Sequence, residues 1–391
     1  MQLSVIILNY NVRFFLEQCV LSVQNALETI DGEIIVIDNN SSDESCEMMK
    51  QLFPNVKLIQ NNENIGFPKG NNIGVAQAQG EFICILNPDT VVTEDTFTKV
   101  LAFAQKQSDF GILGCKLIDG AGNFLPESKR GVPTPWVAFT KVTGLYKLVP
   151  KFRIFGKYYA QHLSENETGK VDILVGAFMF MRRDLYLEVG GFDEDCFMYS
   201  DDVDLSYRVL KEGKSNYYFH ETTIIHYKGE STIKDEMYMK RFQEAMNFFY
   251  KKHFSPDGSG SVLFSIFMKA GIVFFSLVKM FQGKSIIKTV PKAYLLYSAN
   301  EKLVEKLHLV LQNKVRFHDL KTEKMVISSS VKNKKAVEII LDNEFISFKE
   351  CIAILESSRN KGITFKILPK TANFLIGSNN SNERGEIIEI E

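Results

Sequence analysis

The amino-terminal third of the chain alternates short apolar runs with helix-like segments, and this alternation limits the folds that it can adopt. Between residue 3 and about residue 119 the apolar runs read LSVIIL, EIIVID, VKLIQ, EFICILN and FGILGCKL. Strands that are apolar on both faces are typical of parallel sheets covered by helices on either side. The sequence therefore predicts a doubly wound α/β sheet in this part.

A second set of elements follows an irregular stretch. Residues 120–170 mix glycine, proline and aromatic residues, and so long a stretch without periodicity predicts a functional loop or a lid. Beyond it we expect a strand in VDILVGAFMFM, a helix in RDLYLEVG, strands in NYYF and TTIIHY, and a helix over 234–253. Together with the first sheet these elements predict one domain over residues 1–255.

The character of the chain changes after Pro256. Residues 262–281 are mostly apolar and have about the length of a membrane span, yet Lys269 lies in the middle. At ~100° per residue the polar side chains of this segment share one narrow stripe. That pattern favours a helix in the membrane interface, with the lysines of the region up to residue 292 facing anionic headgroups. A spanning helix and a helix buried in a core remain alternatives.

The remainder of the chain predicts two further parts. Residues 293–315 look like another helix, rich in leucine and lysine. From residue 323 onward strand-like and helix-like runs return, among them KKAVEIIL, CIAILESS, ITFKILP and NFLIGS. We expect amphipathic membrane-interface helices over 256–320 and a small α/β accessory domain over 321–391.

Composition excludes some classes of protein. Lysine and arginine number 46 against 47 acidic residues, and a net charge of −1 gives no support to nucleic-acid binding. The six cysteines form no CxxC pair, so we expect buried free thiols rather than zinc ligands or disulfides. The start, MQLSVIILNYN, has neither the basic region nor the cleavage site of a signal peptide. A cytoplasmic protein, attached peripherally to the inner leaflet through residues 262–292, is expected.

Polar residues follow the strands at one edge of the predicted sheet, where ligands of open α/β sheets bind. The first strand ends in Leu8–Asn11, the second in Asp38–Asn40 and the fourth in Asn87–Asp89. Asp38 could cap the next helix or accept a hydrogen bond from a nucleobase. Asp89 could begin a turn, or bind Mg²⁺ or Mn²⁺ beside a diphosphate.

The run NIGFPKGNN, residues 64–72, is a candidate phosphate-binding turn. No GxGxxG follows the first strand and the chain has no GxxxxGK[ST], which argues against an NAD-type fold and a P-loop. Gly66 and Gly70 would permit close approach to a ligand, and a helix starting near Lys69 would direct free N–H groups at it. An ordinary loop-to-helix turn is the alternative.

Three aspartates crowd the segment FMYSDDVDLSYRVLKE, residues 197–212. Asp201 and Asp204 have the spacing of a helix-capping pair, which leaves Asp202 for chemistry. Arg208, one turn beyond Asp204, fits a salt-bridge partner better than a phosphate ligand.

Taken in order, these motifs resemble a known family. SVIILNYN, IIVIDNNSSDES, NIGFPKGNN, ICILNPDT, VGAFMFMRRDLYLEVGGFDEDCFMYSDDVDLSYRVLKEG and IIHYKGEST are similar to family-2 glycosyltransferases with the GT-A fold, close to the bacterial rhamnosyltransferase-like branch. Each motif alone is weak, but the ordered set is specific. The resemblance covers residues 3 to about 253, and weakly the region up to about 315.

The resemblance implies an inverting transfer of a sugar from a dTDP- or UDP-sugar to a hydroxyl of a lipid-linked or polysaccharide acceptor. Asp202 takes the place of the general base, with Asp201 beside it. Asp89 stands where the family's DxD motif binds a divalent cation, Mg²⁺ or Mn²⁺, and His226 matches a histidine that completes this site in some members. The nucleotide-binding residues expected from the motifs are Leu8, Tyr10, Asp38, Asn39, Asn64, Gly66, Lys69, Asn71 and Asn87.

Two departures from the family pattern stand out. The DxD motif is Asn87-Pro88-Asp89, with a single acid, and the usual Glu-Asp pair is Asp201-Asp202. Two other readings remain open. A nucleotidyltransferase would usually carry a glycine-rich motif with Arg and Lys after the first strand, where this chain has LNYNVRFFLE. A non-catalytic module that binds a nucleotide sugar would be favoured by the loss of Asp89 or Asp202, and both are present.

Overall fold

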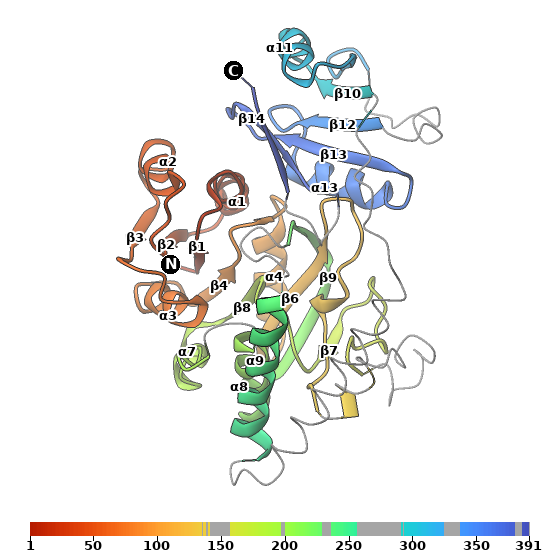
Figure 1. Ribbon diagram of the computed structural model, residues 1–391. Coiled ribbons are helices and arrows are strands. Elements are labelled where there is room, and N and C mark those ends of the chain that lie inside the picture. The colour runs from red at the N-terminus through yellow and green to blue at the C-terminus, as the bar shows by residue number, and fades with distance from the viewer. Residues whose placement is uncertain are drawn as a thin grey trace.

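The protein is organised around two β-sheets (Figure 1). A computed structural model describes residues 1–134, 136–137, 140, 157–196, 200–228, 236–255, 291, 293–323, 337–379 and 385–390. The first sheet and its helices occupy the chain up to α9, and the second sheet follows from residue 293.

The first sheet is mixed but mostly parallel, as the sequence predicts. Its strand order is β3-β2-β1-β4-β8-β6-β9-β5, with β7 paired to β9. The strands are β1 Leu3–Asn9, β2 Gly32–Asp38, β3 Lys57–Gln60, β4 Phe82–Leu86, β5 Thr90–Val91, β6 Phe110–Ile118, β7 Gly169–Val171, β8 Phe178–Arg182 and β9 Ser215–His226. The helices around it are α1 Arg13–Leu27, α2 Ser45–Leu52, α3 Phe67–Ala76, α4 Thr96–Ala104, α7 Arg183–Glu188, α8 Asp201–Lys211 and α9 Glu236–Phe254, with a 3₁₀ turn η1 at Pro126–Ser128.

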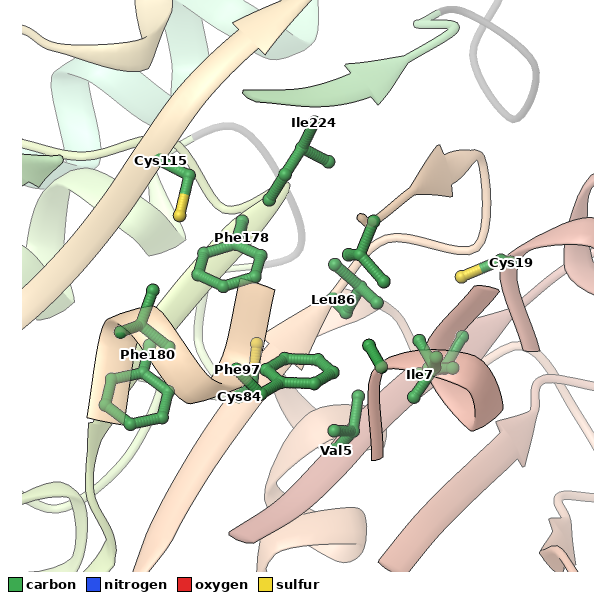
Figure 2. Close-up of a cluster of buried hydrophobic side chains, with 14 of the residues drawn as sticks. Val5, Ile7, Cys19, Cys84, Leu86, Phe97, Cys115, Phe178, Phe180 and Ile224 are labelled. Carbon is green, nitrogen blue, oxygen red and sulfur yellow. The ribbon is translucent and has the colours of Figure 1, made fainter. Parts of the chain in front are cut away.

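An apolar core between sheet and helices holds this arrangement together. Side chains from β1, β4, α4 and β8, among them Ile7, Leu86, Phe97 and Phe178, form one cluster (Figure 2). All four are at most 1% exposed. Burial of this much apolar surface is the main favourable term in folding. All six cysteines are buried, as expected for structural thiols.

Two of the expected strands differ from what the sequence predicts. The run VDILVGAFMFM is interrupted after Val171, because Gly176 and its neighbours leave the sheet to contact α8. NYYF and TTIIHY form the single strand β9, whose register against β6 shifts between Cys115 and Lys116. Such an irregularity lets one strand continue across polar residues that the sequence pattern shows as a break.

The second sheet begins earlier than expected. Its order is β11-β10-β12-β13-β14-β15, and its elements are β10 Ala293–Ser298, α11 Lys302–Leu311, β11 Val315–Asp319, β12 Val337–Asp342, α13 Phe348–Ser357, β13 Ile363–Leu368, β14 Phe374–Gly377 and β15 Glu386–Glu389. Of the helix expected over 293–315, only Lys302–Leu311 is helical, while both ends are strands, and the boundary at residue 321 falls inside this sheet. The run AYLLYS forms β10, which pairs with both β11 and β12. Its sequence does not predict this, because so short an apolar run shows neither the period of a strand nor that of a helix.

The membrane-interface prediction concerns residues that the structure leaves undescribed. Residues 262–281 fall wholly within such a range, as do the lysines expected to face headgroups. Across the helices that are described, none combines the length and the apolar character needed to cross a bilayer.

Candidate active site

The ends of β1 and β2 are bonded to each other at the edge of the first sheet. Asn9 Nδ2 donates to Asp38 Oδ1 at 2.7 Å. The other carboxylate oxygen of Asp38 accepts from the backbone N–H of Ser41 at 2.8 Å. Because α2 begins only at Ser45, the helix-cap reading of Asp38 is wrong. Asp38 instead closes the turn after β2, and Tyr10 beside it is 39% exposed.

An asparagine network joins this turn to α3. Asn39 accepts from Asn61 Nδ2 at 2.8 Å, and it donates to Asn64 Oδ1 and to the carbonyl of Gly66, both at 3.3 Å. Gly66 has φ +84°, a conformation that glycine adopts without a steric penalty. α3 starts at Phe67, two residues before Lys69, and no side chain among the described residues caps it. Its first N–H groups therefore keep their capacity to bind an anion.

Gly70 and Asn71, both in the run NIGFPKGNN, make contacts within the first domain. A Cβ atom on Gly70 would lie 2.4 Å from Leu8 Cδ1, so the close approach that Gly70 permits is to β1 and not to a ligand. Asn71 is buried on α3, where its Nδ2 donates to the Phe67 carbonyl at 2.9 Å. Lys69 is exposed at the start of the same helix.

Asn87, Asp89 and His226 come together where β4, β5 and β9 meet. His226 Nε2 lies 3.4 Å from Asn87 Nδ2 and 3.4 Å from Asp89 Oδ1. The backbone N–H of Tyr227 donates to the Asp89 carbonyl at 3.0 Å, which fixes the acid to the end of β9. Three buried atoms here lack a hydrogen-bond partner within the described ranges: Asn87 Oδ1, Asp89 Oδ1 and His226 Nδ1.

This donor set fits a divalent cation that also binds phosphate oxygens. One carboxylate with an amide or imidazole, completed by a diphosphate, is an ordinary environment for Mg²⁺ or Mn²⁺. Within the described part of the chain, no cluster of three or more His, Cys, Asp or Glu side chains could hold a metal without such help. The arrangement therefore suits a cation that arrives with its diphosphate ligand.

Asp202 lies in the first turn of α8, with its two carboxylate oxygens in different environments. Oδ2 accepts from the backbone N–H of Gly176 at 3.1 Å and pairs with the guanidinium of Arg130. Burial disfavours a charged Arg130, but the Asp202 carboxylate more than compensates and raises the pKa of Arg130. Oδ1 of Asp202 is buried and has no hydrogen-bond partner in the part of the chain that the structure describes. One oxygen is thus held in place while the other stays available.

Two consecutive residues connect this acid to the strand ends. The N–H of Gly176 bonds to Asp202, and the carbonyl of Ala177 accepts from the N–H of Asn87 at 3.0 Å. A Cβ atom on Gly176 would lie 3.5 Å from Asp202 Cβ and 3.7 Å from Phe67 Cζ at the start of α3. The start of α3, the carboxylate of Asp202 and the Asn87–Asp89 segment therefore border one site.

Comparison with known proteins identifies the chain. The sequence model of the glycosyl transferase family 2 matches residues 4–190. Rhamnosyltransferase WbbL of Escherichia coli is 30% identical over 52% of this chain and 78% of its own length. An N-acetylglucosaminyl-diphospho-decaprenol L-rhamnosyltransferase of Mycobacterium tuberculosis is 28% identical over 60% of this chain and 78% of its own. The chain belongs to glycosyltransferase family 2.

The solved structures that resemble this glycosyltransferase are more distant. A mannosyltransferase from Pyrobaculum calidifontis, in complex with GDP-Man and Mn²⁺, has a TM-score of 0.47 and 15% identity over 73% of this chain and 76% of its own. The rhamnosyltransferase-like branch and the GT-A type fold agree with the sequence prediction. The protein is a glycosyltransferase that acts on a nucleotide sugar.

The capping role expected for two acids of this glycosyltransferase is wrong. The residue before α8 is Ser200, and no side chain caps the helix. Asp204 is fully buried and bonds to Arg208 Nε at 2.7 Å, His253 Nε2 at 2.6 Å and Lys252 Nζ at 2.9 Å. The Arg208 partner was expected. Burial alone would raise the pKa of Asp204, but the hydrogen bond to His253, the charge of Arg208 and the hydrogen bond from Lys252 lower it to about 2.

Two residues at or near the site could not be identified from the sequence. Arg130 lies in the irregular stretch, and its pairing with Asp202 spans 72 positions of the chain. Glu127, in η1, forms an ion pair with Lys228 just past β9. Burial opposes a charged Glu127, yet Lys228 and the nearby His226 lower its pKa. Both Glu127 and Arg130 fall in ESKRG, whose charges alone do not separate a site residue from a solvated one.

Proposed function

We propose that this enzyme moves a sugar from a dTDP- or UDP-sugar to an acceptor hydroxyl by a single inverting displacement, with Asp202 as the general base. The observation that carries the proposal is the asymmetry of the Asp202 carboxylate. Oδ2 is fixed by Gly176 and Arg130, while Oδ1 is buried and has no hydrogen-bond partner among the described residues. A general base needs this combination of fixed orientation and a free lone pair.

The acceptor hydroxyl would donate its proton to Asp202 Oδ1 as its oxygen attacks the anomeric carbon. The bond to the departing nucleoside diphosphate breaks on the opposite face, which inverts the anomeric centre. The transition state has oxocarbenium character, as in glycoside hydrolysis. No covalent enzyme intermediate is needed, and Asp201, also buried at the start of α8, would support the position of Asp202.

The nucleotide would lie over the ends of β1 and β2. Asp38, still able to accept a further hydrogen bond, is suited to a nucleobase N–H, and the half-exposed ring of Tyr10 is suited to stacking. The asparagine network, Asn39 and Asn64 with Gly66, would shape the turn that receives the ribose or phosphates. The uncapped N–H groups of α3 would face the diphosphate, and Lys69 would add positive charge.

Asp89, His226 and Asn87 would hold a divalent cation at the diphosphate. When bound, the cation stabilises negative charge on the leaving group. The residues of the chain fix that position: Tyr227 N–H holds Asp89, and Ala177 holds the backbone of Asn87. The single acid of Asn87-Pro88-Asp89 implies that phosphate oxygens complete the ligand set.

A lipid-linked acceptor is the best-supported class of acceptor. The Mycobacterium tuberculosis relative is named for a diphospho-decaprenol acceptor, a polyprenyl lipid. The mostly apolar residues 262–281 and the lysines that follow would bring a cytoplasmic enzyme to the inner leaflet, where such a lipid resides. Flotation of the full chain with anionic vesicles, compared with neutral ones, tests this attachment. Equal recovery with the two kinds of vesicle would show that the lysines do not contribute to attachment.

The products of the reaction separate the proposal from its alternatives. A panel of dTDP- and UDP-sugars is incubated with Mn²⁺ and a polyprenyl-diphosphate-linked sugar, and the released phosphates are analysed. The proposal expects a nucleoside diphosphate and a glycosylated lipid of inverted anomeric configuration, determined by NMR. A nucleotidyltransferase would release pyrophosphate. A non-catalytic module would be stabilised by a nucleotide sugar in thermal shift without any turnover.

A further inference from the structure

Both residues assigned to the cation lie on one small ribbon of the first sheet. β5 and β9 are antiparallel, with Thr90 opposite His226 and Val91 opposite Ile225. Asp89 directly precedes β5, and its carbonyl accepts from the N–H of Tyr227 at 3.0 Å. A displacement of this ribbon would therefore move Asp89 and His226 together.

The face of the ribbon opposite His226 is covered by the second domain, residues 293–390. Side chains alternate between the two faces of a strand, so Ile225 and Tyr227 point away from the face that carries His226. Val91, Ile225 and Tyr227 are at most 1% exposed. They share one apolar cluster with Ile339 and Leu341 of β12 and with the buried face of α13. The apolar back of the cation site is therefore an interdomain core.

The amino terminus of α13 is fastened to the loop that follows β5. The two carboxylate oxygens of Glu94 accept from the backbone N–H groups of Phe348 at 2.7 Å and Lys349 at 3.0 Å. Lys349 Nζ also donates to Asp95 at 2.7 Å. A carboxylate at this end of a helix satisfies free N–H groups and interacts favourably with the helix dipole.

The carboxyl end of α13 is fastened to β6 and β9. Glu356 forms an ion pair with Lys116, which is only 2% exposed, and accepts from Thr223 Oγ1 of β9 at 3.4 Å. A Cβ atom on Gly122 would lie 2.0 Å from the Leu355 carbonyl oxygen. The backbones of the two domains are therefore in close contact here. In Figure 1, α13 lies between the second sheet and the end of β9.

We propose that the second domain positions the cation site: α13, locked by Glu94, holds the β5–β9 ribbon so that Asp89 and His226 meet the donor diphosphate. This inference rests on the proposed function, since it takes Asp89 and His226 as cation ligands. Glu94 is a positioning residue, because it acts through α13 and the loop after β5. Residues 293–390 thereby contribute to donor binding from behind the site.

The test compares two interface variants of the full chain with a control in the same domain. Glu94→Gln weakens the lock on α13, and Ile352→Val removes one methyl group from its buried face. Mn²⁺ is titrated into protein saturated with UDP or dTDP, and bound Mn²⁺ is followed by electron paramagnetic resonance. We expect both variants to bind Mn²⁺ about three- to tenfold more weakly. Turnover at saturating Mn²⁺ should change less than the Mn²⁺ affinity.

The control is Leu307→Ala on α11. Leu307 is fully buried in the cluster on the opposite face of the second sheet. This variant should lower the melting temperature at least as much as Ile352→Val and leave Mn²⁺ affinity unchanged at 20 °C or below. Equal loss of Mn²⁺ affinity in all three variants, or none in the two interface variants, would overturn the positioning role. Ile352→Val keeps the test valid if Glu94→Gln fails to fold.

The proposed function itself is tested by Asp89→Ala in the same titration. If that variant binds Mn²⁺ as the parent does, Asp89 is not a cation ligand, and the positioning role is rejected with it. If it loses Mn²⁺ while Glu94→Gln and Ile352→Val keep it, only the positioning role is rejected.

Discussion

The two sheets arrange their first strands alike and differ in what lies at their strand ends. In the first sheet, β1 has β2 on one side and β4 on the other. In the second, β10 lies between β11 and β12 in the same parallel manner. In both, the chain changes direction beside the first strand, which in open α/β sheets marks the ligand-binding crevice. Topology alone would therefore assign a site to each.

The hydrogen bonds at these ends separate the two sheets. Asn9 Oδ1, Asn87 Oδ1 and Asp89 Oδ1 at the first sheet are buried, and no described residue forms a hydrogen bond to them. At the second, Asp342 accepts from Ser298 Oγ at 2.5 Å and from the Glu344 N–H at 3.1 Å. Asn343 Oδ1 is the one atom at these ends that is buried without a hydrogen-bond partner among the residues described. A buried polar atom without a hydrogen bond destabilises the fold unless a ligand binds to it. Several such atoms lie at the strand ends of the first sheet, so we infer a ligand site there and not at the second sheet.

The largest expected effect comes from Asp202→Asn. The amide keeps the size of the side chain and the contacts of one oxygen, but it removes the proton acceptor. A general base contributes about 10²- to 10⁴-fold in rate, so transfer should fall by at least that factor. Binding of UDP or dTDP, measured by calorimetry, should remain within about twofold of the parent, because the proposed contacts to the nucleotide lie at β1, β2 and α3. Unchanged turnover would remove Asp202 from the reaction.

A second large effect is expected from Asp89→Ala on cation-dependent nucleotide binding. Loss of the only acid in Asn87-Pro88-Asp89 should weaken Mn²⁺-dependent binding by about 10- to 100-fold. The matched control is Asp184→Ala, at the start of α7, where the carboxylate is 70% exposed and pairs with an exposed arginine. Calorimetry with and without Mn²⁺ measures both variants. Equal losses in the two would show that the effect is not specific to the site.

The strand-end acids could be predicted because their signals are local. Asp38 and Asp89 each follow an apolar run whose length and flanks indicate a strand, and Asp202 follows from a known motif. The role of Arg130 could not be predicted, because its contact with Asp202 depends on how a long irregular segment runs through the fold. The run AYLLYS shows the same limit for secondary structure, since six apolar-rich residues suit a strand or a helix until a neighbour pairs with them. Contacts between distant segments decide what local patterns leave open.

Asp204 should affect stability rather than chemistry. Its pKa falls from 3.8 to about 2 in the folded protein, which corresponds to roughly 2 kcal/mol of stabilisation. Because the folded-state pKa is the lower one, this stabilisation is complete above about pH 4 and is lost as the pH falls toward 2. Asp204→Asn should flatten the decrease in unfolding free energy across that window, measured by urea denaturation at a series of pH values. An unaltered slope would mean that other carboxylates set the acid limit.

The smallest effect is expected from Asp342→Asn, and it tests the contrast between the sheets most directly. Burial raises the pKa of Asp342, since the charged form loses hydration that Ser298 and the Glu344 N–H only partly replace. An asparagine can accept from the Glu344 N–H and donate to Ser298 Oγ, so unfolding free energy should change by less than about 1 kcal/mol. Nucleotide binding and transfer should equal those of the parent, measured beside Asp202→Asn under the same conditions. A loss of nucleotide binding in Asp342→Asn would contradict the contrast, because the strand ends of the second sheet would then hold a ligand despite their internal hydrogen bonds.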